Sequence, residues 1–198
     1  GLIPHITEKT TPRPSHPYAI THRAAEDFLL AAHDQKKITG IVIRLSNGFG
    51  APTHPAVNRW TLLVNDLCRQ AVEHRKMTMR SHGLDQRDFV TLHDVGRAVA
   101  HLIHLAPEAC DDGLFNLGGD SSLSVWEMVQ RIAKRCESVL GFTPQIERPA
   151  PGAAAAPAAL TYDIQKIKKT GFTLSGNIDL EIDSLLRLCQ ASFTPARS

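Results

Sequence analysis

The chain has 198 residues, 42% of them hydrophobic and 21% charged, so it is long enough to bury a substantial core. Its formal net charge is only +2 and its basic residues are scattered, which argues against a nucleic-acid-binding face or a polybasic membrane segment. No apolar run approaches the roughly 20 residues that a membrane span needs. These totals predict a globular protein without nucleic-acid or membrane partners.

The cysteines and histidines give no sign of a metal site. The four cysteines lie far apart with no C-x-x-C pair, which is typical neither of a disulfide framework nor of a zinc site. We expect reduced, mostly buried thiols in a cytoplasmic protein. His101 and His104 share a helical face, but no acidic or thiol partner stands near them, so we expect no metal ion there.

The first 45 residues predict a loop, a helix and a strand. Residues 1–17 are rich in Pro, Thr and His and predict an irregular loop. A helix is predicted from Pro17 to about Asp34, because apolar residues recur at the helical period and Pro suits a first turn. The apolar run from Ile38 to Leu45 (ITGIVIRL) is typical of a parallel strand covered on both faces, although its partner is not obvious.

The middle of the chain continues this alternation. An amphipathic helix is predicted over residues 56–75, followed by a strand pair around 77–79 and 88–92. Asp94 can cap the next helix, and a cap is a better interpretation of this residue than a catalytic acid. A further strand is predicted at Leu114–Leu117.

The last third of the chain holds the clearest helix. Ser124 and Glu127 match a capping box at its start, and Gly141 matches its end. Residues 149–159 (PAPGAAAAPAA) predict a low-complexity loop, and the last few residues are expected to fray. Two more helices are predicted, around 164–169 and 178–193. Helices and strands in alternation, with at least one parallel strand, predict an α/β protein.

Tyr18 and His22 are the first candidates for chemistry. They lie four residues apart on the first predicted helix, so they share one face and can reach a common ligand. A phenol polarised by a nearby cation can exchange a proton with a sugar hydroxyl or carbonyl. On spacing alone, however, a tyrosine near a helix N-terminus is more typical of a packing residue.

Five segments resemble, in order, the motifs of one enzyme family. Residues 7–26 (TEKTTPRPSHPYAITHRAAE) resemble a pattern of an acidic residue, prolines, Y-x-x-x-K and A-x-E. The other segments are RLSNGFGAP (44–52), GLDQRDFVTLHDV (83–95), FNLGG (115–119) and YDIQKIKKTGF (162–172). The family is the extended short-chain dehydrogenases/reductases, which include nucleotide-sugar epimerases and dehydratases. The resemblance covers essentially the whole chain.

This resemblance implies a fold class and a division into domains. The chain would be the C-terminal part of a Rossmann-type parallel sheet plus a smaller α+β substrate-binding subdomain. Residues 1–50 would form the end of the NAD(P)-binding domain, and residues 92–119 would return to its sheet. Residues 51–91 and 120–198 would build the substrate-binding subdomain.

The resemblance also implies roles on the cofactor side. Tyr18 would be the catalytic acid/base. His22 stands where the family has a lysine that contacts the nicotinamide ribose and lowers the pKa of the phenol. Ser46, just past the strand, would lie near the nicotinamide of NAD or NADP.

On the substrate side, Asn47 would face the phosphates or the sugar of a nucleotide-sugar, and Arg87 would bind its diphosphate. A planar guanidinium suits this task because its fork can hold phosphate oxygens in a bidentate manner. Taken alone, Arg87 could equally form a surface ion pair with Asp85 or Asp88.

The sequence departs from the family pattern in three ways. The glycine-rich turn that cradles a dinucleotide is absent, since Gly48-Phe-Gly50 is followed by Thr53 where a third glycine would stand. The family's catalytic Ser/Thr precedes the tyrosine and would lie upstream of this chain. His22 is shorter than lysine and, at an ordinary pKa, only about a quarter protonated at pH 7. Replacing His22 by Lys in the complete enzyme should therefore raise its activity.

The expected activity is an NAD(P)-dependent epimerase or dehydratase reaction on a nucleotide-activated sugar, with this chain a fragment that is inactive alone and has uncovered strand edges. The choice between epimerase and dehydratase stays open. The alternative is a degenerate family member that binds a nucleotide-sugar or regulates a partner without catalysis. By analogy with the family, residues 17–34 could form a homodimer interface.

Overall fold

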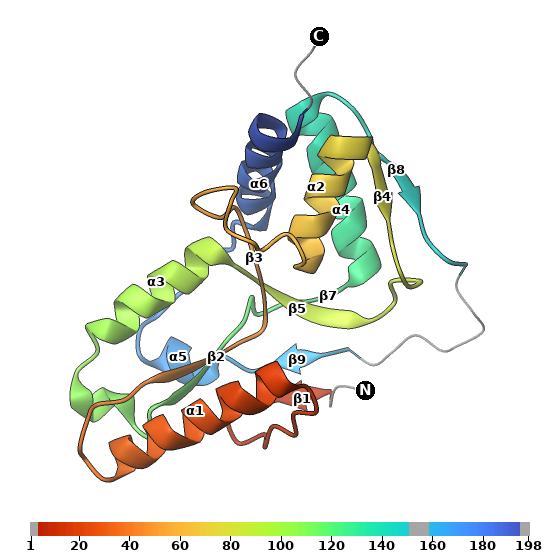
Figure 1. Cartoon of the computed structure of the whole chain (residues 1–198). Coiled ribbons are helices and arrows are strands. Elements are labelled where there is room, and N and C mark those ends of the chain that lie inside the picture. The colour runs from red at the N-terminus through yellow and green to blue at the C-terminus, as the bar shows by residue number, and fades with distance from the viewer. Residues whose placement is uncertain (1–3, 151–158, 195–198) are drawn as a thin grey trace.

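In a computed structural model of the chain, residues 4–150 and 159–194 are described, and they divide between two hydrophobic cores (Figure 1). The first core lies in what we call the sheet region: α1 (Pro17–Asp34), β2 (Val42–Leu45), α3 (Leu92–Ile103), β6 (Leu114–Leu117) and α5 (Gln165–Lys169). The second core lies in the bundle region: α2 (Leu63–His74), β4 (Lys76–Thr78), α4 (Val125–Leu140), β8 (Gln145–Glu147) and α6 (Ile178–Phe193). The remaining elements are β1 (His5–Ile6), β3 (Asn47–Phe49), β5 (Gln86–Thr91), a 3-10 turn (Pro107–Cys110), β7 (Ser122–Ser124) and β9 (Thr161–Tyr162).

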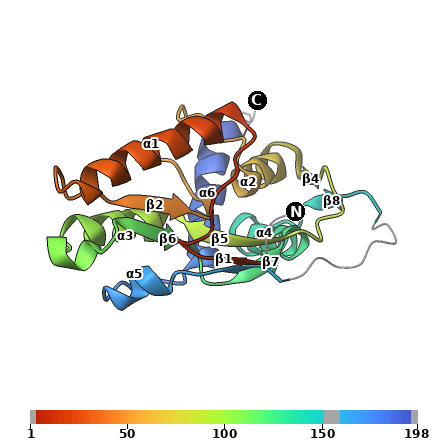
Figure 2. The same ribbon diagram turned by 90° about the horizontal axis from the view of Figure 1, so that it is seen from below.

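The sheet region is built on the parallel pair β2 and β6, in which Val42 lies opposite Leu114 and Leu45 opposite Leu117. Helix α1 lies on one side of this pair and α5 on the other (Figure 2). The predicted α/β class and the predicted parallel strand are therefore confirmed. The strand is shorter than the apolar run, because its first ladder bond joins the Val42 N–H to the Gly113 carbonyl.

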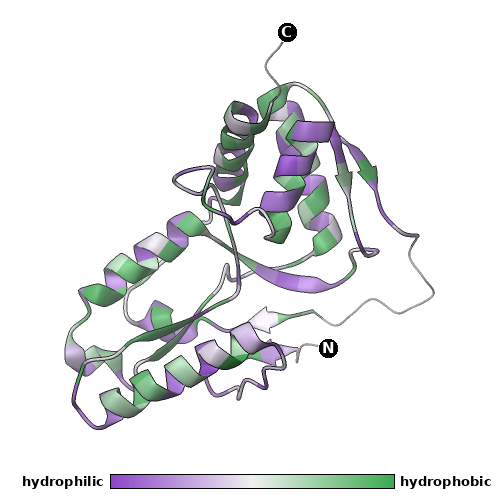
Figure 3. Ribbon diagram, in the orientation of Figure 1, coloured by the Kyte–Doolittle hydropathy of each residue, from purple (hydrophilic) through white to green (hydrophobic). Residues whose placement is uncertain are grey.

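Part of the sheet region's apolar surface is uncovered. Helix α1 has no fully buried residue, and the side chain of Phe28 is 79% exposed. On α3, Ile103 is 71% exposed. Among the described residues β2 pairs with β6 alone, so its other edge has no partner strand. Figure 3 shows that β2 and β6 are mostly apolar, with one polar residue in each, Arg44 and Asn116.

The bundle region buries its core more completely than the sheet region does. Helices α2, α4 and α6 pack together and bury apolar side chains such as Leu67, Ile132 and Leu185. The predicted capping box is confirmed at the start of α4, where the Ser124 hydroxyl accepts from the Glu127 N–H and the Glu127 carboxylate accepts from the Ser124 N–H. Gly141 ends the helix at φ 75°, a conformation that glycine adopts without a steric penalty.

The strands β3, β5 and β7 lie between the two regions. Strand β5 pairs in parallel with β3 and antiparallel with β7. The predicted pair of strands near 77–79 and 88–92 is wrong in its partners, because β4 pairs in parallel with β8 instead. Each strand finds a partner distant in the sequence, which short-range patterns do not encode.

Two predicted helix starts are also wrong. The helix expected over 56–75 begins at Leu63, because the residues before it form a turn in which the Trp60 indole donates to the Pro55 carbonyl. Asp94 does not cap α3. Thr91 is the N-cap, and its side chain accepts from the Asp94 N–H. The Asp94 carboxylate instead binds Arg97 and the loop before α6.

Several smaller expectations can be compared with the structure. The helices expected near 17–34, 164–169 and 178–193 are present, and the strand at Leu114–Leu117 is confirmed. The N-terminal loop contains the short strand β1, which pairs with β9. All four cysteines are buried and unbridged. Most of the loop expected at 149–159 and the last four residues lie outside the described residues.

Within the described ranges no helix is long and apolar enough to cross a membrane.

Candidate functional site

A cavity of about 670 Å³ lies where β3 and β5 meet the N-terminal end of α2. Pockets of this size hold nucleotide-sized ligands. Its walls come from the residues around β3, from residues 60–64 before and at the start of α2, from residues 78–81 after β4, and from β5. Ser46, Asn47 and Arg87, three of the five residues predicted from the sequence, line this cavity.

Arg87 and Arg80 give the cavity its positive charge. Neither guanidinium forms a salt bridge or a hydrogen bond with the described residues, so both remain available to a ligand. The expected alternative, a surface ion pair of Arg87 with Asp85 or Asp88, is therefore not what the structure shows. The start of α2 adds free backbone N–H groups, because its N-cap Leu62 provides no side-chain acceptor. Together these groups suit an anion.

Asn47 is held by the neighbouring strand. Its side-chain N–H donates to the Asp88 carbonyl at 2.9 Å, which leaves the amide oxygen and one N–H for a ligand. Asn65 braces the other end of β3, since its amide bonds both the N–H and the carbonyl of Gly50. The strand that carries Asn47 is thus fixed at both ends.

Asp88 is a buried carboxylate directly beneath the site. It follows Arg87 in β5, and because successive strand residues point to opposite faces, Arg87 reaches the cavity while Asp88 is only 1% exposed. Its oxygens accept from the N–H groups of Gly119 at 2.7 Å and Ser121 at 3.2 Å. A Cβ at Gly119 would lie 1.9 Å from the Phe89 carbonyl oxygen, so only glycine allows this close approach.

Burial raises the pKa of the Asp88 carboxyl, and hydrogen bonding to Ser46, Gly119 and Ser121 only partly opposes that rise. The Ser46 hydroxyl lies close enough to favour the charged form, although its oxygen is buried without a hydrogen bond of good geometry. Ser46 therefore holds an unused polar group at the end of β2.

Tyr18 and His22 lie on α1, outside the lining of the cavity. Their rings are in contact, with centroids 4.3 Å apart, as their four-residue spacing predicts. The Tyr18 side chain is 69% exposed, so it is not the packing residue that its spacing alone suggested. His16 caps the helix just before it, accepting from the Tyr18 N–H.

The geometry of α1 directs Tyr18 toward the end of the sheet where the cavity lies. Arg44 of β2 binds Glu26 of α1 with two hydrogen bonds, of 3.0 and 2.6 Å. From that contact, Tyr18 lies eight residues back along the helix, about 12 Å. Ser46 lies two residues forward along the strand, about 7 Å. Because the helix and the strand run in opposite directions, both displacements point the same way.

The second tyrosine has a different environment. Tyr162 is largely buried, and its hydroxyl donates to the Arg44 carbonyl at 3.0 Å. Burial raises its pKa to about 12, and the nearby Arg44 guanidinium offsets only part of this. Of the two tyrosines in the chain, Tyr18 is thus the one whose hydroxyl is free to meet a substrate.

The described residues provide no cradle for the phosphates of a dinucleotide. Gly48 and Gly50 belong to β3 and the turn after it, and β3 pairs with β5 rather than leading directly into a helix N-terminus. Of Tyr18, His22 and Ser46, the residues expected on the cofactor side, only Ser46 lines the cavity.

Sequence reasoning did not identify Asp66, Arg80 or Asp88 as parts of this site. The burial of Asp88 could have been predicted. Arg87 and Asp88 are adjacent in an apolar strand, so their side chains point to opposite faces and one of them must point to the interior. Asp66 and Arg80 carried no such signal, because a charged residue on the polar side of an amphipathic helix, like Asp66, or beside a predicted turn, like Arg80, is ordinarily solvated.

The comparisons with known proteins agree with the fold. Residues 2–118 match the model of the NAD dependent epimerase/dehydratase family. A dTDP-L-rhamnose 4-epimerase from Burkholderia thailandensis is 31% identical over 132 residues, which are 67% of this chain and 36% of that protein. The chain therefore spans well under two thirds of the length of this relative.

Solved structures share the same architecture. A dTDP-glucose 4,6-dehydratase from Bacillus anthracis superposes with a TM-score of 0.70 at 21% identity, covering 97% of this chain and 57% of that one. A UDP-glucose 4-epimerase from Thermus thermophilus has a TM-score of 0.72 at 19% identity, covering 95% and 58%. The fold is thus that of the C-terminal part of an extended short-chain dehydrogenase/reductase, and the chain belongs to the NAD-dependent epimerase/dehydratase family.

Proposed function

We propose that this chain provides the catalytic tyrosine and the nucleotide-sugar pocket of an NAD(P)-dependent enzyme that epimerises or dehydrates an activated sugar. Residues 1–50 and 92–119 would belong to the cofactor-binding domain, and residues 51–91 and 120–198 to the substrate-binding subdomain, except for the segment around α5, which packs against β6 in the sheet region. The observation that carries this proposal is the cavity in which Asn47, Ser46 and an unpaired Arg87 meet the start of α2.

The substrate's diphosphate would bind between Arg87 and the free N–H groups at the start of α2. A guanidinium fork and a helix N-terminus both favour phosphate oxygens. Arg80 adds a second positive charge in the same cavity. The apolar part of the lining, which includes Trp60, Leu62 and Met79, suits a nucleobase.

Tyr18 would take the proton from a sugar hydroxyl while the carbon that bears this hydroxyl is oxidised to a ketone. NAD or NADP would supply the hydride acceptor and donor when bound. His22, in contact with the Tyr18 ring, would orient the phenol and supply a positive charge when protonated. Ser46, whose buried hydroxyl lies beside the Asp88 carboxylate, would lie near the nicotinamide.

Both thymidine and uridine diphosphates are candidates for the nucleotide. The relatives named above are described with both dTDP-sugars and UDP-sugars. These carriers differ in the ribose 2′-hydroxyl and in one methyl group on the base, so a single residue of the pocket can discriminate between them.

A family member that binds a nucleotide-sugar without catalysis is the second candidate. The observation that favours it is His22 at the position of the family's lysine. Restoring the lysine in a complete, NAD(P)-binding form of the protein separates the two, because His22→Lys should raise turnover in an enzyme. Tyr18→Phe in the same protein should reduce turnover about 10²- to 10⁴-fold and leave nucleotide binding unchanged.

Calorimetric titration of the chain with UDP and dTDP tests the pocket directly. We expect at least one of the two nucleotides to bind. Arg87→Met should lower that affinity roughly ten- to a hundredfold, the usual contribution of a charge-assisted hydrogen bond. Arg187→Met, an exposed arginine on α6 that does not line the cavity, is the matched control and should bind normally. Equal binding by Arg87→Met and wild type, or no binding of either nucleotide, would refute the proposal.

A further inference from the structure

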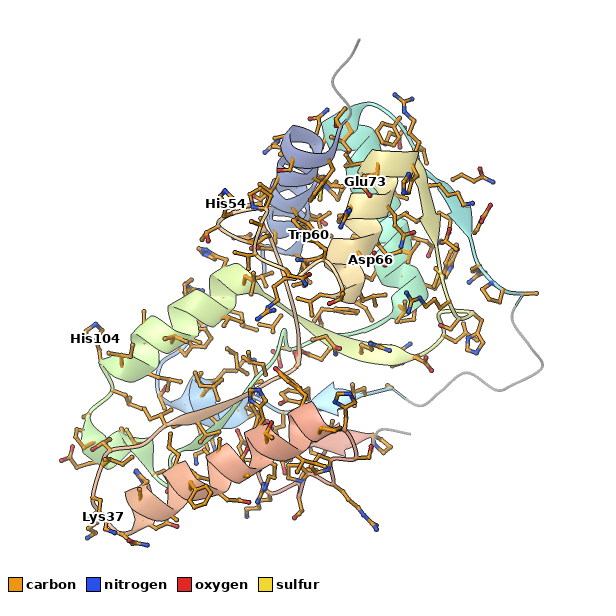
Figure 4. The ribbon with its side chains drawn as sticks, viewed as in Figure 1. Lys37, His54, Trp60, Asp66, Glu73 and His104 are labelled. Atoms are coloured by element: carbon orange, nitrogen blue, oxygen red, sulfur yellow. The ribbon has the colours of Figure 1, made fainter. Side chains whose placement is uncertain are left out.

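Asp66 is the one carboxylate among the cavity-lining residues, in a space that also contains Arg80 and Arg87. Figure 4 labels Asp66 on α2 and Trp60 just before that helix, whose N-terminal end faces β3 and β5. In the described part of the chain Asp66 forms no salt bridge, although two arginines share its cavity. Asp66 lies in the first turn of α2, where the helix dipole favours its negative charge, but none of the described arginines pairs with it.

The Asp66 carboxylate is held in place by a short chain of hydrogen bonds. Its Oδ2 accepts from the Gln70 side-chain N–H at 2.8 Å. The Gln70 side-chain oxygen in turn accepts from the Thr78 backbone N–H at 2.8 Å, which connects α2 to β4. No described residue donates to Oδ1. The structure thus fixes the orientation of a carboxylate that keeps an unused oxygen.

A carboxylate only accepts hydrogen bonds, so its ligand must present a donor. In a nucleoside diphosphate whose phosphates lie at Arg87, the ribose is the next group along the molecule. Its hydroxyls are donors, whereas the base can use the apolar lining that Leu62 and Met79 provide. A carboxylate in the same cavity as the phosphate-binding groups is therefore placed to meet the ribose.

We propose that Asp66 selects a ribonucleoside diphosphate over its 2′-deoxy counterpart by accepting a hydrogen bond from the ribose 2′-hydroxyl. This rests on the proposed function, because it assumes that the cavity holds a nucleotide. A deoxyribose leaves the carboxylate desolvated and without that donor. A site built around a ligand hydroxyl discriminates strongly against the analogue that lacks it.

The test uses UDP and 2′-deoxy-UDP, which differ only in this hydroxyl, in calorimetric titrations of the chain. We expect UDP to bind at least tenfold more tightly than 2′-deoxy-UDP, as befits one hydrogen bond to a charged group. Asp66→Ala should lower the affinity for UDP to that for 2′-deoxy-UDP. The affinity for 2′-deoxy-UDP itself should stay nearly unchanged. Asp66→Asn, which keeps the Gln70 contact but loses the charge, should retain only part of the preference.

Glu73→Gln is the matched control, since Glu73 lies on the same helix outside the cavity and pairs with Arg69. It should keep the full preference. If the Asp66 variants do not fold, the comparison of the two nucleotides on the wild-type chain decides alone. Equal affinity of wild type for both, with binding that still depends on Arg87, overturns the role of Asp66 and leaves the proposed function standing. Binding of neither nucleotide overturns both.

Discussion

The bundle region and the sheet region use the same element types but differ in how completely they bury them. In the bundle region α2, α4 and α6 each bury at least five residues, and together they enclose one core. In the sheet region α1 buries none, and β2 has a partner on one edge only. The cavity lies on the well-packed side, whereas Tyr18 lies on the open one. The proposed nucleotide site and the proposed proton-transferring tyrosine thus lie in parts of the chain that differ in how completely they bury their apolar residues.

The open surface is continuous with a groove beside β2. This groove is lined by apolar residues of β2, α3 and the segments that flank them, among them Ile41, Ile43, Val99 and Ile103. In the solved relatives the matched region is less than two thirds of the chain. We therefore expect the bundle region to keep its structure and its ligand pocket in the isolated chain, and the sheet region to be the less stable part.

The largest difference in the free energy of unfolding is expected between replacing a core residue and replacing an exposed apolar residue. Leu185→Ala in α6 leaves a cavity in the bundle core and should lower the free energy of unfolding by about 2–5 kcal/mol. Phe28→Ala on α1 removes more atoms from a side chain that is largely exposed, so its effect should stay within about 0.5 kcal/mol. Urea unfolding of both variants measures the difference. A large loss with Phe28→Ala would show that α1 is covered in solution.

Two ion pairs between α4 and α6 allow a comparison within one region. Asp183 is buried and binds Arg135 with two hydrogen bonds of 2.6 Å, whereas Asp179 binds Arg131 at the surface. Asp183→Ala should cost about 2 kcal/mol, less than for a fully buried pair because Arg135 is partly exposed. Asp179→Ala should cost under about 1 kcal/mol. Equal losses in thermal or urea unfolding would contradict this assignment of burial.

Hydrogen exchange tests the open edge of β2 residue by residue. The N–H groups of Val42 and Ser46 bond to carbonyls beside β6, so alternation along the strand points those of Ile43 and Leu45 to the other edge. We expect Ile43 and Leu45 to exchange with little protection and Val42 to be clearly protected. Strong protection of Ile43 and Leu45 would mean that another strand covers this edge.

The smallest effect expected is a pH dependence from Asp88. Its pKa is raised by burial, so the folded state binds this proton more tightly than the unfolded state does. Its contribution to stability is therefore fully present below the unfolded pKa and is lost as the pH rises through the folded pKa. Relative to Asp88→Asn, the wild type should lose stability as the pH rises from about 4 toward neutrality. An unfolding difference that does not change with pH would contradict this.

The sequence predicted those elements that are defined by local chemistry. The Ser124–Glu127 capping box and Gly141 lie within one helix, and both are found where expected. The pairing of β4 with β8 could not be predicted, because it joins strands almost 70 residues apart. Asp94 illustrates the same limit, since Thr91 beside it provides the cap and a distant loop captures its carboxylate.

The sequence predicted those cavity residues that lie in segments resembling the family's motifs. Ser46, Asn47 and Arg87 lie in segments that resemble the family, and the fold brings them to one cavity. Asp66 and Arg80 join them from a helix and a turn whose positions depend on the tertiary packing of α2 against β4. No local pattern distinguishes such residues from an ordinary charged surface.

The measurement that tests the central claim most directly is a titration of the isotope-labelled chain with UDP, followed through backbone amide signals in NMR spectra. We expect shifts at Asn47, Arg87 and residues 61–64, with little change along α3 or in the groove beside β2. Shifts confined to that groove, or none at saturating nucleotide, would show that the cavity between β3, β5 and α2 is not a nucleotide site.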